Sequence, residues 1–332
     1  MTFKVGAFVV SVGPWLGVAP ALGELASKSE VSCKSVKAAQ KSGDEIDLEV
    51  GDIIRDGIIG AQVQKPGVSV TAAFLGVNKS YELTVGTALD GSLVVESCGE
   101  DSVEEVSMDG PLAIRNFGSA ATASASSPGQ CADTAYSLHG YKWNSTLRWR
   151  YKADTTPSGL SVTNVVNALT QGTRSITQAR NTCNMADNIP VTQQYLGTGG
   201  KWSNISGNNC LWNSNGVSTV DFAGGGPNVL AGTCTWNTNG HPQGNGIAVE
   251  SDVRFNKVYK NWKPTAAGSC GGRYVIRAVM AHERGHSYGI NHVNETNHGR
   301  LTMSTSLDGP CQEQEFWLGR GDVLSLRARY GV

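Results

Sequence analysis

Apolar and polar residues alternate along much of the first third of the chain. Glu45 to Val50 alternates strictly, which is the pattern of a half-buried strand. The pattern continues in Val68 to Val77, Tyr81 to Ala88 and Ser92 to Cys98, with Gly, Asn and Asp between these runs as turn residues. Several short strands at close spacing predict a small, all-β, sandwich-like N-terminal domain over residues 31–117, either a removable pro-segment or a permanent accessory module.

The pattern is lost over residues 118–130, where Gly, Ala, Ser and Thr predominate. Such a stretch cannot bury apolar surface, so it predicts a linker and a domain boundary. We expect a second domain over residues 131–332.

The second domain mixes both periodicities, which predicts an α+β class with a twisted mixed sheet. Apolar residues at i, i+3, i+4 and i+7 predict a helix from Ser161 to about Thr182, although Gly172 within it weakens the pattern. A second helix is expected from about Gly272 to Tyr288, and a final helix from Asp322 to Tyr330 with Asp322 as its cap. The expected strands are 146–151, several between 190 and 236 with 228–233 the clearest, and 246–256.

The first residues predict the compartment. Lys4 precedes an apolar run that ends at Ala19-Pro20-Ala21, which has the small-x-small form of a cleavage site. We interpret residues 1–21 as a signal peptide. The alternative is a membrane anchor, but two prolines and several glycines in so short a run disfavour a stable span. We therefore expect a secreted, extracellular protein without stable membrane association once the signal is removed.

Charge and cysteine content agree with this expectation. The net charge is −1 and charged residues make up 17% of the chain, so neither a nucleic acid nor an anionic membrane is indicated as a partner. Eight cysteines without any C-x-x-C pair predict four disulfide bonds and no thiolate zinc site. Sequence does not define the connectivity; Cys33–Cys98 and Cys270–Cys311 are our hypotheses. We expect a monomer.

The chemistry of the chain is concentrated in residues 282–292, which read H-E-x-x-H-x-x-G-x-x-H. His282 and His286 are four residues apart, so on a helix their imidazoles point the same way and can bind one metal ion together. Gly289 allows the chain to leave the helix with a positive φ, which returns His292 to the same ion. Three neutral imidazoles with an open fourth position are the ligand set of a catalytic zinc ion, and Glu283 is the candidate general base.

These residues, followed by Met303, resemble the metzincin metalloproteases, in which a methionine turn lies beneath the metal. The likeness covers roughly residues 140–332. A strand at 248–256 and the closing G-D-V-x-x-L-x-x-x-Y-G of residues 321–331 are most similar to the matrixin branch. The resemblance implies two long helices and a small C-terminal subdomain. It also implies zinc ligands at His282, His286 and His292, catalysis by Glu283, and Met303 as a structural residue that does not bind the metal.

The function expected from these residues is that of a secreted zinc endopeptidase acting through a metal-activated water. Its protein or peptide substrate would add in extended form to a sheet edge beside the cleft, with residues 304–308 along the leaving-group side. The alternative is a secreted adhesion or recognition protein with a structural or vestigial metal site.

Two weaker hypotheses concern further metals. A second metal ion at His241 and His298, with Asp221 or Asp252, is one, although surface histidines are the simpler interpretation. For Asp252 a local hydrogen-bond network is the preferred interpretation. A structural Ca²⁺ suits loops rich in Asn, Asp and Gly, but no EF-hand pattern is present.

Overall fold

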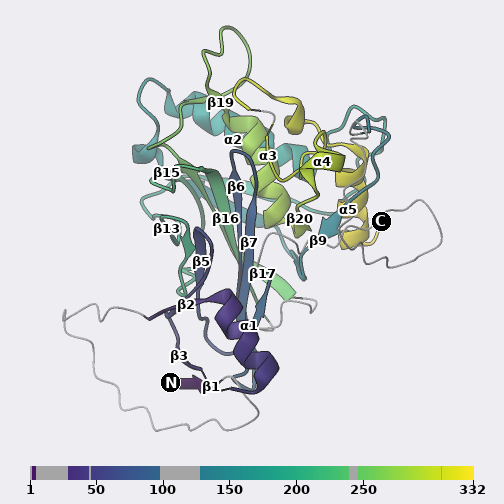
Figure 1. The fold of residues 1–332 in the computed structure, drawn as a ribbon. Helices are drawn as coiled ribbons and strands as arrows, with labels where there is room; N and C mark the ends of the chain where they lie inside the picture. The colour runs from purple at the N-terminus through teal and green to yellow at the C-terminus, as the bar shows by residue number, and fades with distance from the viewer. Residues whose placement is uncertain (1, 5–28, 45, 98–127, 239–245, 308) are drawn as a thin grey trace.

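The computed structural model describes residues 2–4, 29–44, 46–97, 128–238, 246–307 and 309–332 (Figure 1). Helices and strands alternate in a mixed α+β arrangement, as expected from the two periodicities. The central element is a nine-stranded sheet. Its strands, in spatial order, are β12 (Gln193–Thr198), β11 (Leu147–Tyr151), β15 (Ser218–Ala223), β17 (Gly246–Asn256), β16 (Val229–Thr238), β6 (Val68–Gly76), β7 (Tyr81–Thr87) and β8 (Leu93–Glu96), with β10 (Tyr141–Lys142) beside β17.

The sheet changes direction at β16. Strands β12, β11, β15 and β17 are parallel, whereas β16 runs antiparallel to β17. On its other side β16 pairs antiparallel with β6, from Val229↔Gly76 to Thr238↔Val68. Strands from residues 68–96 and from residues 147–256 therefore lie in one sheet.

The prediction of a small all-β sandwich at the N-terminus is corrected in two respects. Three of its strands extend the sheet of the following segment, because alternation reveals that a strand is half-buried but not which strand it pairs with. Residues expected to be strand-like also form a helix, α1 (Cys33–Ser42). Its ends carry ordinary helix signals, since Ser32 Oγ accepts the N–H of Ser35 and Gly43 closes the helix with φ 78°.

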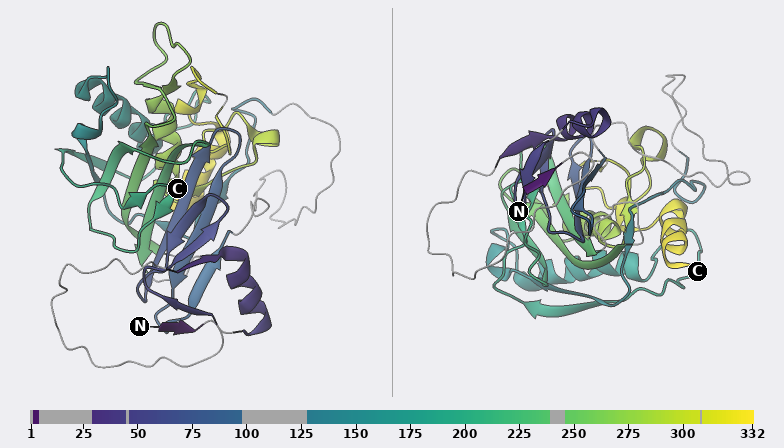
Figure 2. Two further views of the ribbon diagram at one scale, coloured as in Figure 1. Left: turned by 60° about the vertical axis from the view of Figure 1, so that its left-hand side comes forward. Right: turned by 90° about the horizontal axis from the view of Figure 1, so that it is seen from below.

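A five-stranded sheet also joins the two segments. Its order is β13 (Ile205–Ser206), β14 (Asn209–Cys210), β5 (Ile59–Gln62), β4 (Ile53–Asp56) and β2 (Glu30–Ser32). Between it, α1 and the large sheet lies a hydrophobic cluster that includes Val36, Ile54 and Phe74 together with Cys234 and Trp236. Figure 2 shows α1 and these strands on one side of the large sheet and α2 on the other.

Helices α2 (Val162–Thr177) and α3 (Ile276–Ser287) pack against each other and against the large sheet, in a second cluster that contains Leu169, Phe255 and Met280. The predicted helix at 161–182 is confirmed with Ser161 as its N-cap, and it ends at Thr177. The predicted helix at 272–288 begins later, at Ile276. Gly172 does not interrupt α2.

The final helix, α5 (Arg320–Tyr330), corrects the assigned cap. Gly319 is the N-cap, and Asp322 is the third helical residue, whose carboxylate accepts the Gly319 N–H at 2.7 Å. The remaining elements are short: β1 (Thr2–Lys4), β3 (Asp47–Glu49), β9 (Ser137–Leu138), β18 (Trp262–Lys263), β19 (Tyr274–Val275), β20 (Ile290–Asn291), α4 (Glu295–His298), and 3-10 turns at Ala153–Thr155 and Gln314–Phe316.

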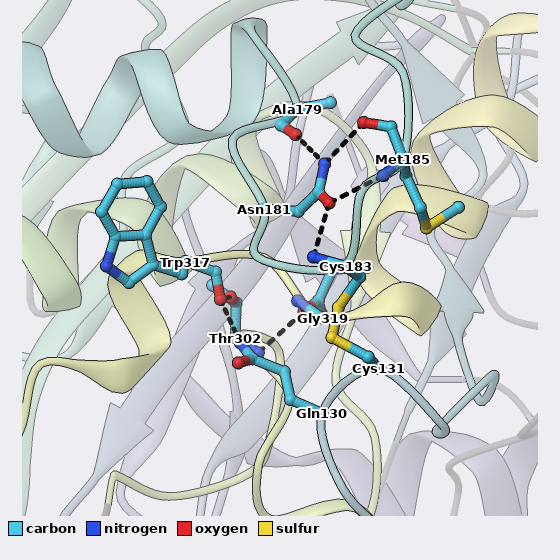
Figure 3. The surroundings of a disulfide bond; sticks show 10 residues. Gln130, Cys131, Ala179, Asn181, Cys183, Met185, Thr302, Trp317 and Gly319 are labelled. Carbon is cyan, nitrogen blue, oxygen red and sulfur yellow. Dashed lines mark hydrogen bonds between the residues drawn. A yellow bond between two sulfur atoms is a disulfide. The ribbon is translucent and has the colours of Figure 1, made fainter.

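Three disulfide bonds are present among the described residues: Cys131–Cys183, Cys210–Cys234 and Cys270–Cys311. The last confirms one proposed pairing. Cys33 is disulfide-bonded as well, and its proposed partner Cys98 lies outside the described residues. Beside Cys183, the Asn181 side chain accepts the N–H groups of Cys183 and Met185 and donates to the carbonyls of Ala179 and Met185 (Figure 3). Disulfides in this number are typical of proteins that fold in an oxidising compartment.

The predicted signal peptide and the predicted linker lie largely outside the described residues. Of the proposed signal peptide only residues 2–4 are described, and they pair with β3. Of the proposed linker only residues 128–130 are described. No helix in the described part of the chain is long and apolar enough to cross a membrane.

Candidate metal centre

Helix α3 presents two of the three predicted ligands. His282 and His286 lie one turn apart on its buried face, and neither is exposed to solvent. The helix is held there because Ile276, Val279 and Met280 pack into the cluster beneath the sheet. Hydrophobic packing of this helix therefore sets the direction of both imidazoles.

The third ligand returns through the turn at Gly289. Gly289 has φ 83°, in the left-handed region, and a Cβ there would overlap the carbonyl oxygen of Tyr141. Because of the positive φ and this overlap, any residue other than glycine would be energetically costly here. The chain then enters β20, and His292 follows it with 2% of its surface exposed. The positive φ expected at Gly289 is present.

The three imidazoles converge. The distances between Nε2 atoms are 3.1 Å for His282–His286, 3.1 Å for His282–His292 and 3.0 Å for His286–His292. Ligand nitrogens about 2.0–2.1 Å from a tetrahedral zinc ion are roughly 3.3 Å apart, so this triangle fits such an ion closely. No other His, Cys, Asp or Glu of the described residues joins the group.

The tautomers of His282 and His286 are fixed by hydrogen bonds at Nδ1, on the side of each ring away from the converging Nε2 atoms. His282 Nδ1 lies 2.7 Å from the carbonyl oxygen of Thr302, and His286 Nδ1 lies 3.0 Å from that of Ile290. A carbonyl only accepts, so both Nδ1 atoms carry the proton and both Nε2 lone pairs face the centre. Burial lowers the pKa of His282 to about 3, and burial together with the neighbouring imidazoles lowers that of His286. The rings are therefore neutral near pH 7, as metal binding requires.

Met303, the predicted structural residue of the site, packs against α3 at Gly285, which lies between His282 and His286 in the helix. It is 1% exposed and packs so closely on α3 that a Cβ at Gly285 would overlap its Sδ atom. The turn around it is held by Asp322, whose carboxylate accepts the N–H groups of Thr302 at 2.9 Å and Met303 at 3.2 Å. Since the Thr302 carbonyl accepts from His282, α5 is linked through Asp322 and Thr302 to a ligand.

Glu283 is buried, and its two carboxylate oxygens differ in their hydrogen bonding. Oε2 accepts a hydrogen bond from Thr233 Oγ1 of β16 at 2.5 Å. Oε1 is buried and has no hydrogen-bond partner among the described residues. Burial raises the pKa of Glu283 to about 8. An acidic oxygen without a protein partner among the described residues, on the residue that follows His282 in α3, fits a site that binds a cation.

Besides Thr233, the structure adds two residues that sequence reasoning missed. Glu82 of β7 lies with one carboxylate oxygen 3.4 Å from His139 Nδ1 and the other 3.8 Å from His292 Nδ1. His139 Nε2 is in turn 3.4 Å from His286 Nδ1. His139 had one available signal, since the chain has only 6 histidines. Glu82 had none beyond its place in an alternating strand.

The hypothesis of a second metal site is not supported among the described residues. His298 Nδ1 lies 2.9 Å from a carboxylate oxygen of Asp133, which is neither of the two carboxylates proposed as its partners. Asp221 forms an ion pair with Arg254 at 2.7 Å. Asp252 accepts the N–H groups of Asn204 and Thr219, which confirms the preferred interpretation of a local network. His241 lies outside the described residues.

No model of a known protein family matches the chain, and no curated protein sequence matches it either.

Proposed function

We propose that this chain is a secreted, zinc-dependent endopeptidase of the metzincin type. The observation that carries the proposal is the triangle of Nε2 atoms, with sides of 3.0–3.1 Å, built from an H-E-x-x-H helix and a third histidine after a glycine turn. Glu283 supports it, because a purely structural metal needs no carboxylate beside its first ligand. Met303 supports it as the methionine on which the resemblance to metzincins rests. The three disulfides and the apolar N-terminal run support secretion.

His282, His286 and His292 would hold the zinc ion, which supplies an acidified water and a polarised substrate carbonyl. Glu283 takes up the proton of the attacking water at Oε1, the oxygen without a protein partner. It then delivers that proton to the nitrogen of the departing amine. A divalent cation nearby favours the charged form of Glu283, which opposes the effect of burial on its pKa.

The substrate in this proposal is a protein or peptide segment in extended form. Main-chain hydrogen bonds to the edge of a strand would hold it, and pockets would select alternate side chains. Strand β16 is the candidate, because its Thr233 contacts Glu283 directly. Residues 304–307, which follow Met303, would border the leaving-group side.

One observation favours the alternative, a secreted recognition protein with a structural metal. His282, His286 and His292 are at most 2% exposed, as ligands of a structural ion usually are. The two functions differ in the need for Glu283, so a substitution there separates them.

The first prediction is that Glu283→Gln abolishes hydrolysis but keeps the metal. We expect casein hydrolysis by the protein recovered from the medium, with any processed form included, to fall by roughly 10²–10⁴-fold, the usual contribution of a general base. Zinc content and the unfolding midpoint should be unchanged. Glu49→Gln, at an exposed position, is the matched control. Hydrolysis by Glu283→Gln at the wild-type rate, or wild-type hydrolysis that a chelator does not abolish, contradicts the proposed function.

A further inference from the structure

The edge of β16 beside Glu283 is already occupied. Strand β17 pairs with one side of β16 and β6 with the other, antiparallel and along the whole of β6. In this register Ala73 of β6 lies opposite Thr233, the residue bonded to Glu283. An extended peptide that adds to this edge would need the place that β6 holds.

The next strand reaches the ligands themselves. Glu82 of β7 is opposite Ala73, so Thr233, Ala73 and Glu82 form a row across three strands. Directly paired residues point to the same face of a sheet, which here is the face toward α3. Glu82 ends 3.8 Å from the ring nitrogen Nδ1 of His292.

The end of the β6–β7 hairpin contacts the opposite side of the site. Gly76 forms a parallel bridge with Ser306, and Ser80 Oγ donates to the carbonyl of Thr305 at 2.7 Å. These residues belong to the segment after Met303. In Figure 1 the hairpin runs beside β16 up to the level of α3. It therefore extends from the strand edge to the leaving-group side, and all three ligands beneath it are buried.

We propose that the hairpin of β6 and β7, residues 68–87, is a built-in inhibitor that occupies the position of an extended substrate on β16. The proposal rests on the proposed function and adds its regulation. It also defines the chemistry of the competing segment. The part of β6 nearest Thr233 is Ala72-Ala73-Phe74-Leu75, which is uncharged, and Leu75 lies in the same apolar cluster as Met280 and Leu307. The opened edge therefore accepts an uncharged, strand-forming peptide.

Phe74 offers a way to loosen the hairpin without touching the metal site. Its ring covers Gly232 of β16, where a Cβ would overlap the ring. Neighbouring strand residues point to opposite faces, so Phe74 lies on the side away from Ala73 and α3. Phe74→Ala removes this contact and leaves the histidines and Glu283 unchanged.

The experiment measures access to the imidazoles directly, on the full chain freed of metal with EDTA. Diethylpyrocarbonate modifies accessible histidines, and mass spectrometry locates the products. Trypsin cleavage after Arg277, Arg284 and Arg300 places His282 in one peptide, and His286 and His292 in a second that also contains His298, the internal reference with 18% of its side chain exposed. We expect the three ligands to react in Phe74→Ala about tenfold or more faster than in the wild type, because local opening exposes them.

Ile54→Ala is the matched control, since Ile54 is buried in the same cluster but lies on β4, away from β16. It should lower the unfolding midpoint comparably and leave the reaction rates near those of the wild type. A second pair of variants, with smaller effects on packing, tests the proposal if Phe74→Ala does not fold. Ser80→Ala removes the bond to Thr305 and should raise the rates, whereas Ser92→Ala, at an exposed turn hydroxyl bonded to Asp90, should not.

A peptide in trans tests the mimicry. A lysine-flanked peptide with the sequence of residues 68–77 should protect the histidines of Phe74→Ala again, and a scrambled peptide should not. The proposal is overturned by wild-type ligands that react as fast as His298, by equal acceleration in Ile54→Ala, or by equal protection from both peptides. If zinc-loaded Phe74→Ala exposes its ligands but does not hydrolyse casein, the inhibitory placement stands and the proposed function fails.

Discussion

At the scale of single residues, the sequence predicted the three converging histidines but not the residues that contact the site from other strands. H-E-x-x-H-x-x-G-x-x-H defines a spacing that a helix and a glycine turn bring to one point, so the convergence of His282, His286 and His292 could be predicted without a structure. Glu82, His139 and Thr233 are brought to the site by strand pairing across long sequence separations. No local pattern encodes that pairing, which explains why these residues were missed.

Asp322 gives the second prediction, on pH. Burial raises its pKa to about 6, although three backbone N–H groups bond to its carboxylate. An acid whose pKa is higher in the folded state stabilises that state fully below its unfolded pKa near 3.9, and this stabilisation is lost as the pH rises to about 6. Relative to Asp322→Asn, the free energy of unfolding of the wild type should fall by about 2 kcal/mol between pH 4 and pH 6.5.

Urea unfolding of both proteins over this pH range measures the difference. The asparagine variant should also be less stable at every pH, since one amide oxygen cannot serve three donors. A difference between the two proteins that does not change with pH would show that Asp322 keeps an ordinary pKa.

At the scale of elements, periodicity identified most strands and both long helices, but not every boundary. The predicted strand at 246–256 and β17 coincide, whereas α3 begins four residues later than expected because residues 274–275 pair with β18 instead. Gly172 looked like a weak point of its helix. It is in fact a point of close approach between α2 and α3, since a Cβ there would lie only 2.6 Å from Arg277 O and Met280 Cβ.

The third prediction follows from this approach. Gly172→Ala should destabilise the protein by about 1–3 kcal/mol, because overpacking at the helix contact outweighs the roughly 1 kcal/mol that alanine gains in helix propensity. Thermal unfolding checks it, with Asn167→Ala at an exposed position of α2 as control. If both variants are equally stable or more stable than the wild type, α2 and α3 do not meet at Gly172.

At the scale of the whole molecule, the two halves of the chain share sheets and a hydrophobic core. One cluster combines residues 31–95 with Ile205, Cys210, Val229, Cys234 and Trp236. The Cys210–Cys234 bond connects β14 of the small sheet to β16 of the large one. The composition of residues 118–130 predicted a boundary between the halves, but composition along the chain does not report pairing between distant strands.

The fourth prediction is that the Cys210–Cys234 bond stabilises the packing of the two sheets against each other. Replacing Cys210 and Cys234 with alanine should lower the free energy of unfolding by about 2–4 kcal/mol, the usual contribution of a disulfide. Urea unfolding measures the loss. Because the double variant keeps the rest of the cluster, we expect a single cooperative transition. Undiminished stability would indicate that the sheets are held together without this bond.

The most direct test of the central claim is X-ray absorption spectroscopy of the zinc-loaded full chain, together with its zinc content. We expect one zinc ion per chain, with three imidazole nitrogens at about 2.0–2.1 Å and one oxygen as ligands. His292→Ala should lose one of the three nitrogens or the metal itself. A chain that binds no zinc, or binds it through four protein donors, contradicts the account.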